Sequence, residues 1–70
     1  MCREEFVARV YAEINRLPSL QREVVVHKLQ GLTLDQITQK LGLTKYTVTQ
    51  SLLAALAILR QRLREFEGGL

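Results

Sequence analysis

Residues 33–44 read TLDQITQKLGLT and contain the most specific structural signals of the sequence. Thr33 and Gln36 have the spacing of a capping box, in which each side chain bonds the other residue's backbone amide at the start of a helix. Gly42 then supplies the left-handed conformation that a tight turn between two helices requires. Thr44 follows as a second N-cap. The stretch therefore predicts a helix, a tight turn and the start of another helix, which is a helix-turn-helix.

The chain before this stretch predicts two further helices. Apolar residues recur there at helical spacing, and no pair of runs has the pattern of a β-hairpin. We expect the first helix over about residues 3–16, because Pro18 disfavours helical geometry in the residue before it. The second helix opens at Pro18, or at Ser19 as a competing N-cap, and reaches about Gln30. Gly31 is suited to end it.

After the turn, the helical pattern continues without a break to about Phe66. The predicted core face of this long helix consists of Val48, Leu52, Leu56, Leu59, Leu63 and Phe66. The sequence thus predicts one all-α domain over residues 1–70, a four-helix fold with three short helices and one long C-terminal helix. Residues 1–32 hold the first two helices, and residues 33–66 hold the helix-turn-helix with its extended recognition helix.

Length and composition limit the possible functions. A chain of 70 residues has room for one small domain, which excludes a deep active-site cleft, a two-domain enzyme and a dinucleotide-binding fold. A single cysteine, Cys2, fits a reducing compartment. The longest apolar run, residues 52–59, is far short of a membrane span. Since the start of the chain has no signal-peptide pattern, we expect a cytoplasmic protein.

No residue set in the sequence predicts an enzyme. The chain has no Ser/His/Asp set, no paired carboxylates on one helix face and no phosphate-binding glycine loop, so we expect no catalytic residues and no cofactor. His27 has no second ligand at metal-binding spacing and is expected to be a solvated surface histidine. The net charge is +3, and residues 33–66 hold five Lys or Arg against two Asp or Glu. This basic half permits an anionic partner such as nucleic acid.

The second helix of the helix-turn-helix is expected to present its first turns outward, where it can enter the major groove of DNA. The predicted DNA-binding residues on this face are Thr44, Lys45, Tyr46, Thr49, Gln50 and Leu53. Thr44 and the free backbone amides can hold a phosphate, and Lys45 adds positive charge. Gln50 can read adenine, and Leu53 can touch a thymine methyl group. The alternative is that residues 33–52 form a simple αα-corner of a small bundle.

Four stretches of the sequence, in order, resemble sigma factor region 4, the C-terminal −35-binding domain of the sigma-70 superfamily. They are LPSLQREV (17–24), LQGLTLDQI (29–37), LGLT (41–44) and Thr47-Val48. The sequence is most similar to the extracytoplasmic-function sigma factors of the iron-transport group. The resemblance covers about residues 15–66. It implies a domain for transcription initiation that recognises the promoter −35 element, packs on the RNA polymerase β flap and is commonly held by an anti-sigma factor. It also places Arg22 near the DNA backbone.

Two features depart from the pattern of the resembled family. Residues 46–59 contain no charged side chain, and since DNA affinity comes chiefly from neutralising phosphates, we expect weak intrinsic DNA binding. Thr38 occupies the position at which helix-turn-helix units usually have a small alanine. A sigma factor also needs a region that melts the −10 element, for which this chain has no space. We therefore expect either an excised domain or a standalone relative.

A second interpretation keeps the fold and changes the partner. In it the chain is a protein-interaction module, in which an exposed apolar patch at Leu53, Ala57 and Ile58 binds an anti-sigma factor or a second copy in a weak homodimer. A helix-turn-helix of the response-regulator type ranks third, because that group usually ends its recognition helix early and adds a separate fourth helix.

Overall fold

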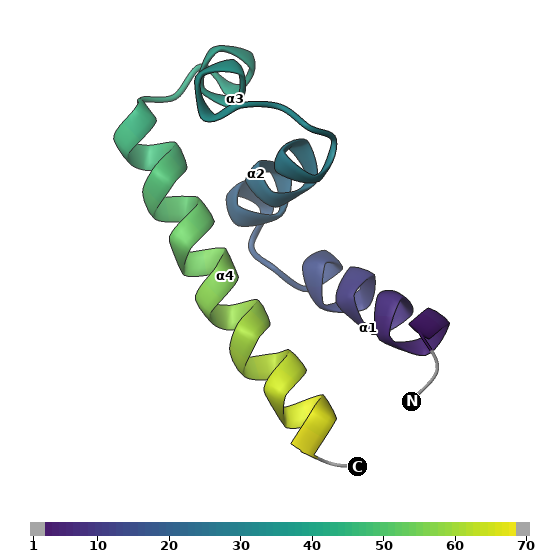
Figure 1. Cartoon of the computed structure of the whole chain (residues 1–70). Helices are drawn as coiled ribbons and strands as arrows, with labels where there is room; N and C mark the ends of the chain where they lie inside the picture. Colours follow the sequence, from purple (N-terminus) through teal and green to yellow (C-terminus); the bar gives the residue numbers. More distant parts are fainter. Residues whose placement is uncertain (1–2, 69–70) are drawn as a thin grey trace.

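The fold is a long helix with three shorter helices packed along one side of it (Figure 1). The computed structural model describes residues 3–68, with side chains described over residues 3–65. Its helices are α1 (Arg3–Asn15), α2 (Ser19–Leu29), α3 (Leu34–Leu41) and α4 (Lys45–Gly68). At a rise of 1.5 Å per residue, the 24 residues of α4 span about 36 Å. The long axis of the molecule is 40 Å, so α4 is its framework, and the predicted all-α class is confirmed.

The predicted helix boundaries around α2 are close to those observed. α1 ends at Asn15, and Pro18 takes the N-cap position of α2 with an extended ψ of 150°. Ser19 is the first helical residue, so the alternative of Ser19 as the N-cap is wrong. The fixed φ of proline suits this entry, where a backbone N–H has no helical partner. At the other end Gly31 has a φ of +96°, as expected of the residue that ends a helix.

The core consists of two apolar clusters that meet along α4. One contains Ile14, Leu17, Val25, Ala55 and Leu59. The other contains Val24, Ile37 and Val48. Leu52 packs against both clusters and joins them. Because α4 contributes to each cluster, the short helices are fixed relative to one another chiefly through α4.

Within the described side chains, the buried face of α4 differs from the predicted one at Ala55, Leu56 and Ile58. The prediction placed Leu56 in the core, but Leu56 is 43% exposed, whereas Ala55 is completely buried. Ala55 belongs to the cluster that α1 and α2 form with α4, and its small side chain allows these helices to approach closely. Phe66, which was also predicted to belong to the core, lies outside the described side chains.

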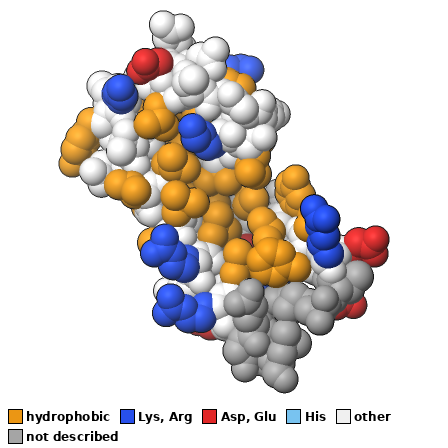
Figure 2. All heavy atoms as spheres, in the orientation of Figure 1, with side chains coloured by type: hydrophobic (Ala, Val, Ile, Leu, Met, Phe, Trp, Pro, Cys, Tyr) orange, Lys and Arg blue, Asp and Glu red, His pale blue; other side chains and the backbone are white. Residues whose placement is uncertain are grey.

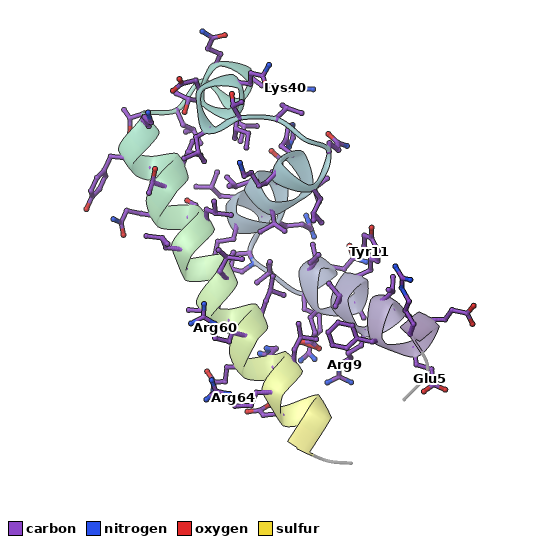
Figure 3. All side chains as sticks on the ribbon, viewed as in Figure 1. Glu5, Arg9, Tyr11, Lys40, Arg60 and Arg64 are labelled. Atoms are coloured by element: carbon purple, nitrogen blue, oxygen red, sulfur yellow. The ribbon has the colours of Figure 1, made fainter. Side chains whose placement is uncertain are left out.

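A buried carboxylate ties α1 to α4, which the sequence interpretation missed. Glu13 is 2% exposed and has three arginine neighbours. Its Oε1 lies 3.5 Å from Arg9 Nε and 3.2 Å from Arg16 Nη1, and its Oε2 lies 3.6 Å from Arg62 Nε. Arg62 is therefore engaged within the fold. Arg60 and Arg64 instead extend from the side of α4 that faces away from α1 (Figure 3).

Candidate nucleic-acid interface

The turn between α3 and α4 is built by the local interactions that the sequence predicts. Thr33 Oγ1 accepts a hydrogen bond from the Gln36 amide at 3.2 Å, and Gln36 Oε1 accepts one from the Thr33 amide at 2.8 Å. This is the expected capping box. Gly42 ends α3 in the left-handed conformation, with φ of 68° and ψ of 33°. The helix-turn-helix prediction is therefore confirmed at both of its key positions.

Thr38, in the place of a small alanine, is accommodated by a hydrogen bond inside its own helix. Its Oγ1 donates to the carbonyl oxygen of Leu34 at 2.8 Å, so the hydroxyl of this half-buried side chain is satisfied. The carbonyl of Thr38 in turn accepts from the amide of Leu43 at 3.1 Å, just past the turn. Thr38 therefore does not disturb the turn.

Thr44 caps the start of α4, as predicted. Its Oγ1 accepts from the Thr47 amide at 3.1 Å and donates to Thr47 Oγ1 at 2.9 Å. One turn on, Val48 is completely buried against Ile37 of α3 and Val24 of α2. The cap fixes where α4 begins, and Val48 fixes which of its faces points inward. The opposite face of the first turns is therefore presented to solvent.

This outward face holds most of the predicted DNA-binding residues. Tyr46 lies three residues before Thr49 and four before Gln50, and Leu53 follows these two residues by four and three, so all four share one side of the helix. Tyr46 is 74% exposed and Leu53 is 56% exposed, whereas Thr49 is half-buried. Thr44 and Lys45 lie exposed at the N-terminal end of the same surface.

Arg22 lies on α2 and not on α4. It lies near the start of α2, at the end of that helix that adjoins α1, and its Nη1 donates to the carbonyl oxygen of Asn15 at 3.4 Å. α3, by contrast, follows the other end of α2 (Figure 1).

The charge on the candidate interface is small. Lys45 is the one cation that α4 carries before Arg60, and its Nζ lies 3.5 Å from Asp35 Oδ1 on the first turn of α3. Both side chains are largely exposed, at 66% and 77%. Lys40 projects from the last turn of α3, on the side away from the start of α4 in this view (Figure 3). This arrangement offers few cations for phosphate contacts.

The predicted protein-interaction patch is exposed at two of its three residues. Leu53 and Ala57 lie exposed on α4, and Leu56 adds to them. Ile58 is half-buried and packs against the core cluster, so the expectation that it belongs to the exposed patch is corrected. It turns toward the core cluster because it lies about a third of a turn around the helix from the line of Leu53 and Ala57. We call Leu53, Leu56 and Ala57 the outer apolar face.

Hydrophobic side chains are visible over the middle of the molecule in Figure 2, with lysines and arginines toward its ends. His27 is half-buried, and its Nδ1–H donates to the carbonyl oxygen of Glu23 at 2.6 Å. Among residues 3–65, no three His, Cys, Asp or Glu side chains gather as a metal site would require. No helix in the described part of the chain has the length and apolar character needed to span a membrane.

Comparison with known proteins identifies the family. The family described as "Sigma-70, region 4" matches residues 8–59, which is more than half of the chain. The matched part includes most of α1, all of α2 and α3, and the portion of α4 that forms the candidate interface. The chain matches no curated protein and no solved structure. Sigma factor region 4 is a DNA-binding regulatory domain and not a family of enzymes. The chain thus belongs to the sigma-70 region 4 family.

Proposed function

We propose that this chain recognises the −35 element of a promoter and contacts the RNA polymerase β flap during transcription initiation. The observation that carries the proposal is the exposed face of α4 at Tyr46, Thr49 and Gln50, directly after a capped helix start. A helix held in this way can enter the major groove with its N-terminal residues against the base edges. The role places the chain in the cytoplasm, with DNA and polymerase.

Each residue of this face has a chemical role in the proposal. The side-chain amide of Gln50 matches the donor and acceptor pair that adenine presents in the major groove, and Leu53 provides an apolar contact for a thymine methyl group. The amides of the first turn that Thr44 does not cap can bind a phosphate together with Lys45. Arg22, near the start of α2, is proposed as a contact to the DNA backbone.

Binding to DNA alone is expected to be weak, because α4 has no charged side chain over residues 46–59. We therefore propose that contact with the polymerase holds the domain on the promoter. The sequence similarity supports a place among the extracytoplasmic-function sigma factors of the iron-transport group. In that setting an anti-sigma factor is a further expected partner.

Selection from a random duplex library tests the proposal, carried out with the chain in the presence of the isolated β-flap domain. We expect one recurring sequence motif to be enriched, and fluorescence anisotropy to show tighter binding to that duplex when the flap domain is added. Enrichment of no motif, with binding that ignores both sequence and salt, contradicts the proposal.

The outer apolar face supports a second candidate function. Leu53 and Leu56 are 56% and 43% exposed, and surface patches of this kind mark protein contacts. We propose that this face binds a protein, either an anti-sigma factor or a second copy of the chain. Leu53 belongs both to this face and to the DNA face, so the two kinds of partner would compete.

A further inference from the structure

The ion pair between Lys45 and Asp35 connects the two helices of the candidate DNA interface. Lys45 is the first residue of α4, and Asp35 is the second residue of α3. Their charged atoms lie 3.5 Å apart across the turn. Lys45 is also the cation best placed on α4 to meet a phosphate, since residues 46–59 carry no charge. The single cation of this part of the recognition helix is thus already paired with an acid.

The positions of the two charges explain why the pair forms. The N-terminal end of a helix carries a partial positive charge, which favours Asp35 at the start of α3 and disfavours Lys45 at the start of α4. Asp35 offsets the unfavourable position of Lys45 by placing a carboxylate beside its ammonium group. A phosphate at the same end of α4 would do the same. Asp35 and a DNA phosphate therefore compete for one position.

We propose that Asp35 limits the affinity of this domain for DNA by holding Lys45 away from the phosphate backbone. The inference rests on the proposed DNA-binding function and adds a residue that regulates it. Because phosphate contacts act on every sequence alike, the limitation lowers the affinity for every duplex by the same factor and leaves base recognition by Gln50 unchanged. A larger fraction of the remaining binding free energy then comes from contacts to the bases, although the ratio of affinities between duplexes is unchanged.

The test is fluorescence anisotropy of the full 70-residue chain with a labelled duplex pool of random sequence at low salt. Asp35→Asn keeps the shape of the side chain and its preference for a helix start, and the capping box of Thr33 and Gln36 is untouched. We expect this variant to bind about two- to fivefold more tightly, the range that an exposed ion pair supports. The gain should fade as salt is raised.

Two controls separate the proposed route from a simple change of net charge. Glu5→Gln makes the same charge change at an exposed position near the start of α1 (Figure 3) and should leave affinity unchanged. In a Lys45→Ala background, Asp35→Asn should also have no effect, because the cation that it would release is absent.

Several outcomes would overturn the inference. An equal gain from Glu5→Gln, or an undiminished gain in the Lys45→Ala background, shows that Asp35 acts by general repulsion and not through Lys45. Unchanged affinity of Asp35→Asn, in a chain whose binding Lys45→Ala weakens, shows that the ion pair does not restrain Lys45. If the unmodified chain and all variants fail to bind DNA at any salt concentration, the proposed function itself fails.

Discussion

Gly42 shows how one residue fixes the angle between two helices. Its φ of 68° is a conformation that side chains with a Cβ atom disfavour, and an added Cβ would meet nothing within 4 Å. The cost of Gly42→Val is therefore conformational and not steric, and we expect a loss of about 1–2 kcal/mol in the free energy of unfolding. Urea melts measure it. Gly42→Asn, which tolerates the left-handed region better, should lose less; equal stability of all three proteins contradicts the role given to the turn.

At the residue scale, variants of Lys45 and Gln50 should distinguish phosphate contacts from base recognition. Lys45→Ala removes a phosphate contact for which Asp35 competes, so affinity should fall for every duplex and the dependence of log affinity on log salt should become shallower by up to about one. Gln50→Ala should cost about 1–3 kcal/mol on the preferred duplex and little on others. Titrations of a selected duplex and a single-base mismatch give both values.

Gln61→Ala is a matched control for these titrations. Gln61 is exposed on α4, about three turns past Gln50 and beyond the candidate interface. Its removal should change neither affinity nor sequence preference. If Gln50→Ala behaves like Gln61→Ala on both duplexes, Gln50 does not read a base.

At the scale of elements, the attachment of α1 depends on Glu13. Its carboxylate is 2% exposed, while its three arginine partners are 40–60% exposed and can still reach water. Removing one partner of a fully buried pair costs about 3–5 kcal/mol, so this partly exposed cluster should cost less, about 1–3 kcal/mol for Glu13→Gln. Urea unfolding checks the value, with exposed Glu5→Gln as the control. Equal stability of both variants contradicts an anchoring role.

The helices also show which features of the fold could be predicted from the sequence and why other features could not. The capping box, the left-handed glycine and the Thr44 cap each depend on residues within about one turn of one another, so the spacing of these residues was sufficient to predict them. The burial of Ala55 in place of Leu56 depends on where α1 and α2 cross α4. The burial of Glu13 likewise depends on Arg62, far along the chain. Such contacts arise only when the helices pack, and helical periodicity does not report them.

The site predictions also divide into those that depend on one helix and those that depend on how the helices pack. The outward face of α4 follows from the register of one helix, since Val48 must point inward. The bond of Arg22 to Asn15, the pairing of Lys45 with Asp35 and the inward turn of Ile58 depend on how the helices are arranged.

At the scale of the whole molecule, α4 extends for most of the 40 Å length while the shorter helices cover one side of it. Its other side is left to solvent, and there the outer apolar face follows the DNA face along the helix. A face of this kind invites association, because burial of apolar surface contributes about 25 cal/mol for each Å². Replacing Leu53 and Ala57 by Glu together should therefore yield a folded chain that no longer self-associates.

Light scattering at increasing concentration, with circular dichroism to follow folding, measures both properties. Unmodified chains should grow in apparent mass with concentration, whereas Leu53→Glu/Ala57→Glu should remain monomeric at an unchanged melting temperature, because both positions are exposed. Ile58→Glu provides the contrast: it places a carboxylate against the core cluster and should lower the melting temperature instead. If the unmodified chain is monomeric at every concentration, self-association is excluded, and the partner for this face is a different protein. If the double variant unfolds, Leu53 and Ala57 support the core.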